Sequence, residues 1–590
     1  MTGSKSQWIW GSLVTLSLFL ALGSSRLPAQ QPSTDTTALR AELQKTATEY
    51  ERIRKNSAPH RLMQNAFCDE KVGRYCIVYD VGTSQALPPE PEQVKQARAK
   101  AIDAFKRGFA LWPADTLVAG PLVRYLIENA QPKDALTVAQ QHTDVSPNRH
   151  WAIMVQGLAL HSMADDSTAE SAFASVLQQQ LPFDRVRMRD VAPLLARDEE
   201  ERYRALAARD RARYQERLWN LADPLFLTAG NESLTEHFAR QIYGRILAVA
   251  PAVDNLGWGP DAEILTLRFG VPTTRTRNYG QGSGGISIVE HFPPTQLTYV
   301  PPAAITKGAL TVHEPGSAWP YDTIRSRSGY APLTFRWMQV LEHQIARYPG
   351  ATAGTVRVDF QFKLDSIAPR PARVEVGLFL LDSMAQVVGT IRDTVVGERD
   401  LISARLSAPL TAGVVAYSVE ALELGSRQAG RARYNFPVSK PGRLAVADLV
   451  ILSAGDAAPP KSKTDAAFQP FSSLRIPRGQ PIALYVEARG LKPAASKRVR
   501  YRVDLEVLEQ SSPGTFTRAV RSLGRLLGVA GDPVAPRVTW TEEQPAADLT
   551  VIALKLGAMQ LEPGVKQFRL TLTDLETQAA TVIERLIRVE

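Results

Sequence analysis

Residues 355–363, Thr-Val-Arg-Val-Asp-Phe-Gln-Phe-Lys, mark the point at which the chain changes its periodicity. Every second residue from Val356 to Phe362 is apolar, so an extended strand here would have one apolar and one polar face. Helical spacing extends up to Arg347 instead. The two periods predict a multidomain α+β protein, with helices before residue 349 and half-buried antiparallel strands after it. We expect few contacts to cross this boundary.

Two sets of alternating segments follow, over residues 349–440 and 441–590, and Pro441-Gly442 separates them. The spacing of these segments predicts two β-sandwiches of immunoglobulin-like type. Residues 301–348 precede them and contain several proline and glycine pairs, which predict a loop-rich linker. We expect one helix in this linker, from Leu333 to Arg347.

The composition is typical of a folded protein with several domains. The chain has 590 residues, of which 44% are hydrophobic and 22% charged, and this length exceeds what one core can serve. A net charge of +9 is a weak field over such a chain, so we expect no nucleic-acid partner. The presence of only two cysteines excludes a disulfide-built scaffold and any four-thiolate zinc or iron–sulfur site within one chain.

The first 29 residues have the pattern of an export signal. Lys5 supplies a positive charge, an uncharged apolar run extends from Trp8 to Leu22, and the small residue Ala29 precedes Gln30. As a helix this run would span roughly 22 Å, which is short of a ~30 Å hydrocarbon core. We therefore expect a cleaved signal peptide over residues 1–29 rather than an anchor. No later apolar stretch is long enough to cross a bilayer, so a periplasmic or secreted protein is predicted.

Residues 30–90 form an N-terminal segment that contains both cysteines. Cys68 and Cys76 enclose a polar stretch in which Gly73 lets the chain turn back. In an oxidising compartment the two can pair, and a disulfide is our expectation. A redox pair would normally have two residues between its cysteines. A zinc site would need two further ligands, and His60 is the only histidine nearby.

Residues 91–185 are helical in pattern and periodic. Ala101, Ala135 and Ala169 are spaced 34 residues apart, and Phe105 and Phe173 follow the first and third by four residues. Small residues at helix crossings, followed by an aromatic residue one turn later, suit stacked helical hairpins. The segment resembles a degenerate tetratricopeptide repeat array. An ordinary helical domain in which the spacing is accidental is the alternative.

The most specific passage lies within residues 186–300. Its distinctive residues are Trp219, Asp223, Pro224, Asn231, Glu232, Glu236, Arg240, Gly257, Trp258, Asp261, Gly270 and Pro272. Their order and spacing resemble the GWxTD domain of exported bacterial proteins. The resemblance implies an α/β domain in which a Gly-Trp-x-Thr-Asp turn leads into a strand. This chain departs from the pattern, because Pro260 stands in place of the threonine and Ala262-Glu263 replace the usual Arg-Gly.

Two interpretations of these signature residues remain open. The charged members, such as Asp223 and Glu232, could line a polar cleft, and paired carboxylates are what acid–base chemistry requires. Ion pairing that fixes the domain is the simpler interpretation. Trp258 is expected to cover a strand that contains Ile264, Leu265 and Leu267, and therefore to contribute more to stability than to activity.

No sequence motif assigns a cofactor, a metal or a catalytic residue. The glycines from Gly280 to Gly285 match a dinucleotide fingerprint, but an alternating segment and then prolines follow them where a helix is required. The sequence thus predicts an exported scaffold or interaction protein with a protein or cell-envelope partner. The alternatives are a hydrolase-like enzyme that uses the carboxylates, and a carbohydrate-binding protein in which Tyr417, Tyr485 or Trp540 stacks on sugars.

Overall fold

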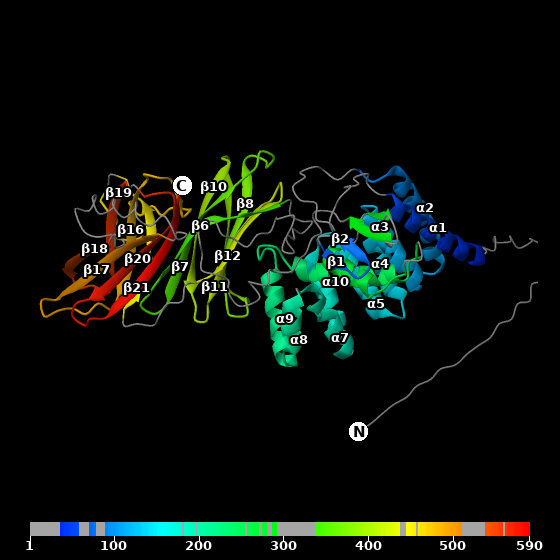
Figure 1. Cartoon of the computed structure of the whole chain (residues 1–590), viewed down its shortest axis with the longest axis horizontal. Helices are drawn as coiled ribbons and strands as arrows, with labels where there is room; N and C mark the ends of the chain where they lie inside the picture. Colours follow the sequence, from blue (N-terminus) through cyan, green and yellow to red (C-terminus); the bar gives the residue numbers. More distant parts are fainter. Residues whose placement is uncertain are drawn as a thin grey trace, which may run out of the picture.

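The computed structural model describes residues 36–57, 70–77, 89–179, 182–195, 197–253, 257–270, 274–279, 286–291, 337–436, 444–455, 458–509, 537–558 and 561–590. Helices predominate in the first half of the chain and strands make up the second half (Figure 1). The prediction of an α+β protein with a helical N-terminal region and a β-rich C-terminal region is therefore confirmed. Within the described residues, no helix combines the length and the apolar composition needed to cross a membrane.

The helices of the N-terminal region, called the helical half below, have the following bounds. They are α1 (Thr36–Asn56), α2 (Glu92–Leu111), α3 (Thr116–Glu128), α4 (Pro132–Val145), α5 (Arg149–Ser162), α6 (Asp166–Gln179), α7 (Pro182–Arg189), the 3-10 turn η1 (Ala192–Leu194), α8 (Arg197–Ala205), α9 (Ala208–Ala222), α10 (Glu232–Ala248) and α11 (Pro260–Phe269).

Helices α1 to α6 pack as consecutive neighbours around one apolar core, and α10 closes this core against α3, α5 and α6. Ala101, Ala135 and Ala169 are fully buried in it. Gly157 lies where α5 and α6 approach closely, since a Cβ atom there would stand 2.5 Å from the Phe173 ring. The small residues at 34-residue spacing therefore mark helix contacts.

A four-stranded sheet joins distant parts of the helical half. Its strands are β1 (Glu70–Val72), β2 (Tyr75–Ile77), β3 (Thr274–Tyr279) and β4 (Ile286–His291), in the order β1-β2-β4-β3. β2 and β4 are parallel neighbours. Cys76 thus belongs to a strand of this sheet, whereas Cys68 lies outside the described residues, so the disulfide stays a prediction.

The segment after Trp258 is a helix, which corrects the strand expected at Ile264–Leu267. Pro260 occupies the first turn of α11 and Gly270 ends it with a φ of 79°, which are the usual positions of these residues at helix ends. Ala262, Leu265 and Phe269 are buried at helical spacing. A short apolar run alone does not distinguish a buried strand from a helix.

The first β unit consists of two sheets around a shared core. Its strands are β5 (Trp337–Val340), β6 (Glu342–Tyr348), β7 (Gly354–Lys363), β8 (Ala372–Leu381), β9 (Val387–Gly397), β10 (Leu401–Leu410), β11 (Ala416–Glu423) and β12 (Gln428–Asn435). One sheet has the order β10-β7-β6 and the other β5-β12-β11-β8-β9. Val356, Val358, Phe360 and Phe362 are fully buried, as their alternation predicts.

The helix expected from Leu333 to Arg347 is wrong over its described part, which forms β5 and β6. The burial of β6 explains the error, because almost every residue from His343 to Tyr348 is buried. Ile345 faces the core of the first β unit, while Ala346 and Tyr348 pack against the next unit. A strand buried on both faces has no alternation of polar and apolar residues to reveal it.

The second β unit repeats this plan. Its strands are β13 (Ala445–Val446), β14 (Val450–Ser453), β15 (Arg475–Ile476), β16 (Pro481–Arg489), β17 (Arg498–Glu509), β18 (Arg537–Pro545), β19 (Thr550–Ala558), β20 (Gly564–Asp574) and β21 (Ala580–Val589). β16 pairs with β13, β14 and β19, and the second sheet has the order β15-β21-β20-β17-β18. In both units a short strand lies parallel to the last strand, as β5 does to β12 and β15 to β21.

Candidate functional site

The signature residues surround α10 at three places. The stretch around residues 223–231, called the connector below, joins α9 to α10 and carries or adjoins Trp219, Asp223, Pro224, Asn231 and Glu232. Glu236 and Arg240 lie on α10, and Gly257, Trp258 and Asp261 lie in or next to the turn before α11. Gly270 ends α11, and Pro272 lies outside the described residues.

Two arginines of β12 hold the connector by its backbone. Arg431 donates hydrogen bonds to the carbonyl oxygens of Asp223 at 3.1 Å and Pro224 at 2.9 Å. Arg433 donates to the carbonyl oxygens of Leu221 at 3.0 Å and Asp223 at 3.1 Å. Residues two apart on a strand share a face, so this face of the first β unit meets the helical half. We call this contact the joint.

Glu420 on β11 completes the polar part of the joint. Its carboxylate accepts a hydrogen bond from the Leu227 amide at 3.0 Å and pairs with Arg433 at 3.1 Å. Both side chains of this ion pair are fully buried, and Ser418 donates a further hydrogen bond to Glu420. A buried ion pair is stable only when such additional hydrogen bonds satisfy it.

Apolar packing surrounds these polar contacts. Leu221, Leu225 and Leu227 form one buried cluster with side chains of the five-stranded sheet, among them Phe379 and Leu381. The centroid of the Phe226 ring lies 5.5 Å from that of the Phe379 ring. The Arg433 guanidinium lies over the Phe226 ring, 4.0 Å from its centroid. The expectation that few contacts link the helical and β halves is therefore wrong at the connector.

Asp223 and Glu232 lie at opposite ends of the connector and are brought close together by its fold. The Ser233 hydroxyl donates to the Ala222 carbonyl oxygen at 2.7 Å, which places residues 222 and 233 next to each other. Asp223 exposes 9% of its surface and Glu232 exposes 2%. Both acidic side chains are thus buried, and the charge of Asp223 acts on Glu232.

The electrostatics of this pair favour the protonated form. Burial is the main cause that raises the pKa of Asp223, to about 8, with a smaller contribution from Glu420, while Arg433 and Arg431 lower it. Burial and then the charge of Asp223 raise the pKa of Glu232 well above its usual range, although the Thr228 hydroxyl donates to it at 2.6 Å. Among the described residues, Asp223 Oδ1 and Glu232 Oε2 have no hydrogen-bond partner.

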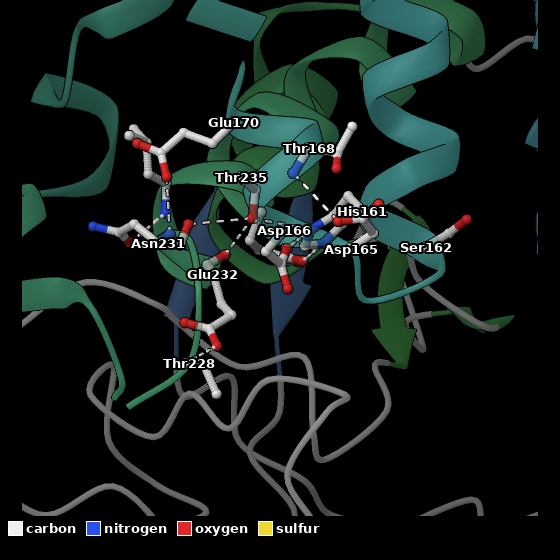
Figure 2. A network of polar contacts seen from close by, with 12 residues as sticks. His161, Ser162, Asp165, Asp166, Thr168, Glu170, Thr228, Asn231, Glu232 and Thr235 are labelled. Carbon is white, nitrogen blue, oxygen red and sulfur yellow. Dashed lines mark hydrogen bonds and ion pairs between the residues drawn. The ribbon is translucent and has the colours of Figure 1, made fainter. Parts of the chain in front are cut away.

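Asn231 fixes the start of α10. Its side chain accepts a hydrogen bond from the Leu234 amide at 3.0 Å, which is the usual helix N-cap, and donates to the Trp219 carbonyl oxygen at 2.8 Å. The Asn231 amide donates to Glu170 of α6 at 3.0 Å, as Figure 2 shows. Trp219 is buried and lies 4.8 Å from the His237 ring.

His161 at the end of α5 bridges two carboxylates, of which Figure 2 shows Asp166. Its Nδ1 lies 2.8 Å from Asp166 and its Nε2 lies 2.7 Å from Glu236, while Thr235 donates to the same Asp166 oxygen. Burial alone would lower the pKa of His161, but the hydrogen bonds to Asp166 and Glu236 raise it to about 9. The histidine is therefore a cation at neutral pH.

Arg240 extends this chain of charges to α11. It pairs with Glu236 and donates to the carbonyl oxygens of Leu267 and Arg268, the latter at 2.8 Å. Burial would raise the pKa of Glu236, but Arg240 and His161 lower it to about 2. The arginine thus holds the last turn of α11 against α10, because the carbonyl groups of that turn have no partner within the helix.

Asp261 clamps the hairpin between β1 and β2. Both of its carboxylate oxygens bind Arg74, at 2.6 and 2.8 Å, and Arg74 also donates to the Gly257 carbonyl oxygen at 3.2 Å. Hydrogen bonding to Arg74 is the main cause that lowers the pKa of Asp261 to about 2. A Cβ atom at Gly73, which has a φ of 55°, would stand 2.4 Å from the Asp261 Cβ. The turn therefore requires glycine.

Apart from Asp223 and Glu232, the charged signature residues form ion pairs whose partners belong to the chain itself. Each ring nitrogen of His161 faces a carboxylate, whereas a general base needs a nitrogen directed at the substrate proton. Glu236 and Asp261 are neutralised by Arg240 and Arg74 in the same way. Across the described ranges, no three or more His, Cys, Asp or Glu side chains gather as a group that could hold a metal ion.

The sequence analysis did not identify several of the residues that complete these contacts. They are Arg74, His161, Glu420, Arg431 and Arg433. One signal was available for the last two, since Arg431 and Arg433 alternate with Gly430, Ala432 and Tyr434 and would share one face of a strand. The structure shows that this strand is buried from Gln428 to Tyr434. Two arginines on one face of a buried strand require partners.

Two of the three aromatic residues proposed as sugar platforms, Tyr417 and Tyr485, do not have the exposure that stacking on a ligand requires. Their exposures are 1% and 0%, whereas Trp540 is partly exposed and packs one side against the core of the second β unit. That interpretation of the two tyrosines is therefore wrong. Tyr417 instead contacts the Nε2 of His343 at 3.0 Å inside the first β unit.

No protein-family model matches this chain, and no curated protein matches it. Among the solved structures that are similar to part of it are β-glucuronidase 2 of Bacteroides uniformis covalently bound to cyclophellitol-6-carboxylate aziridine, and β-glucuronidase of Bacteroides uniformis. Each is 8% identical over 40% of this chain, with TM-scores of 0.15 and 0.14. The chain covers 26% of the length of each, and we draw no inference from likenesses of this size.

Proposed function

We propose that this chain is an exported, non-catalytic scaffold protein of the bacterial cell envelope. The observation that supports this function is that Glu236, Arg240 and Asp261 all bind groups of the chain itself. Residues that resemble the GWxTD signature would then serve to hold α10, α11 and the β1–β2 hairpin together. A protein partner in the envelope is the expected ligand.

The domain types belong to the same proposal. The strand order of both β units supports an immunoglobulin-like sandwich. In each unit a sheet of three or four strands faces a sheet of five, and the last strand lies beside a short parallel one. The buried alanines at 34-residue spacing support a tetratricopeptide-like array over residues 91–185. Both architectures commonly present surfaces to partners, although neither fold defines a function by itself.

Export would place the cysteines in an oxidising compartment. We expect the mature chain to begin near Gln30 and to contain a disulfide between Cys68 and Cys76. N-terminal sequencing of the exported protein checks the first point, and its intact mass before and after alkylation checks the second. Retention of Met1, or two alkylated thiols in the native protein, would contradict these expectations.

A rescue experiment distinguishes a scaffold from a hydrolase. Cells without this chain would be compared with cells that carry the wild type, Glu236→Gln or Asp261→Asn, at matched levels of folded protein. If the chain is a scaffold, both folded variants restore envelope integrity, measured as resistance to detergent, and both are recovered in the same cross-linked complex as the wild type. If a folded variant forms the complex but fails to restore resistance, the carboxylate acts chemically and the scaffold proposal is wrong.

A further inference from the structure

The joint between the connector and the first β unit contains two buried acidic side chains, Asp223 and Glu232. The hydrogen bonds of the described residues leave one carboxyl oxygen of each side chain unsatisfied. We propose that Asp223 and Glu232 share one proton inside this joint, and that release of the proton loosens the helical half from the first β unit. The inference concerns a conformational response of the molecule and does not depend on the proposed function.

The geometry supports a shared proton. Each member of the pair has a buried carboxyl oxygen, Oδ1 of Asp223 and Oε2 of Glu232, that finds no hydrogen-bond partner in the part of the chain that the structure describes. Leaving a charged acceptor buried and unsatisfied is costly, more so than for a neutral one. Two neighbouring carboxylates cannot both ionise cheaply, and one proton between them removes both the repulsion and the missing hydrogen bond.

The surrounding charged groups do not neutralise the negative charge that the pair would carry if both carboxyl groups were ionised. On the β side, Arg431 and Arg433 face it, but Arg433 is paired with Glu420 and both arginines donate to backbone carbonyl groups. On the side of α6, Glu170 raises the pKa of Asp223 and Asp166 raises that of Glu232. Three further carboxylates thus face the pair, against two arginines that already serve other acceptors.

Asp223 also connects the protonation of the pair to the hydrogen bonds of the joint. Its carbonyl oxygen accepts hydrogen bonds from both Arg431 and Arg433. Its neighbour Pro224 supplies one more acceptor. A displacement of the Asp223 side chain that relieves repulsion from Glu232 therefore moves the acceptors on which the β unit holds the connector.

The direction of the pH dependence follows from the raised pKa of the pair. An unfolded chain releases carboxyl protons near pH 4, whereas the folded chain retains one until about pH 8. The stabilisation from the protonated pair is therefore present at low pH and is lost as the pH rises through about 8. We expect a tight joint at pH 6 and a looser one at pH 9.

Hydrogen exchange of the full-length chain tests this inference. Protection of the backbone amides in residues 221–231 would be measured at pH 6 and pH 9, with rates corrected for intrinsic exchange. In the wild type, protection should fall by about tenfold or more. In the double variant Asp223→Asn with Glu232→Gln, which cannot ionise, it should stay constant. Asp198→Asn, in an exposed ion pair on α8, should behave as the wild type.

Two results would overturn the proposal: constant protection in the wild type, or an equal fall in the double variant. Both substituted side chains are buried, so the double variant could fail to fold. The infrared spectrum of the wild type therefore gives an independent measurement. A carbonyl band of a protonated carboxyl group at pH 7 that disappears by pH 9 supports the shared proton. Absence of this band at pH 7 contradicts it.

Discussion

Trp258 links two apolar clusters of the helical half. Its ring packs against the core of the helical array and against the smaller cluster that contains Val72, Tyr75 and Leu265. A Cβ atom at Gly244 of α10 would lie 3.5 Å from the indole, so the tryptophan fits closely over a small residue. The side chain remains partly exposed.

We expect Trp258→Ala to reduce the free energy of unfolding by about 3 kcal/mol, the lower end of the range for truncating a buried aromatic side chain, because the ring is only partly buried. Thermal denaturation measures the effect, and Trp258→Phe, which keeps much of the apolar contact, should lose less. A Trp258→Ala chain that melts at the wild-type temperature would contradict a structural role and favour an exposed platform.

At the scale of elements, the charged network around His161 ties three helices together. His161 comes from α5, Asp166 from α6 and Glu236 from α10. The pKa of His161 is raised from 6.5 to about 9, so the folded chain holds a proton that the unfolded chain releases. Its stabilising contribution is complete below pH 6.5 and is lost as the pH rises through about 9.

We therefore expect the stability difference between the wild type and His161→Gln to be largest near pH 6 and to shrink by about 3 kcal/mol toward pH 10. Chemical denaturation at a series of pH values measures this difference, and comparing the two chains cancels the titration of other groups. The exposed His150, whose ring is hydrogen-bonded to Gln179, supplies the control His150→Gln. A difference that does not change with pH would show that His161 is neutral in the folded chain.

Some elements were predictable from the sequence and others were not, for a physical reason. The alternation from Val356 to Phe362 predicted β7 because that strand has one buried face. β6 gave no such signal, since the first core buries Ile345 and the second β unit buries Tyr348. The residues of the candidate site also fall into two groups. The spacing of residues along the chain identified Asp223, but it gave no indication that Arg431 is its partner. Their contact joins residues 208 positions apart, and only the fold brings them together.

At the scale of the whole molecule, β6 is a structural member of both β units. The Arg347 guanidinium binds both carboxylate oxygens of Asp448 at 2.9 Å, and Arg585 of β21 donates to the Ile345 carbonyl oxygen at 2.8 Å. Gln344 exchanges hydrogen bonds with the backbone of Ile451. The molecule therefore consists of three successive blocks, which are the helical half, the first β unit and the second β unit (Figure 1). Specific polar contacts link each block to the next.

The role of β6 predicts where the chain can be divided. A fragment that begins at residue 349 lacks β5 and β6, so it loses one edge of each sheet of the first β unit and the contacts of Arg347. We expect it to melt at a lower temperature than a fragment that begins at residue 337, and to expose apolar surface that binds a fluorescent dye. Equal melting temperatures and equal dye binding would show that β5 and β6 are dispensable.

The parallel pairing of β5 with β12 has a mechanical consequence. These strands are the first and the last of the first β unit, and four residue pairs join them side by side in the same direction. A pull on the two ends of the unit acts along both strands in opposite directions, so their hydrogen bonds bear the force together instead of opening one after another. An antiparallel pair of terminal strands joined at one end would unzip. A chain held at both ends would thus resist stretching at this unit, and the load would pass from β5 to β12.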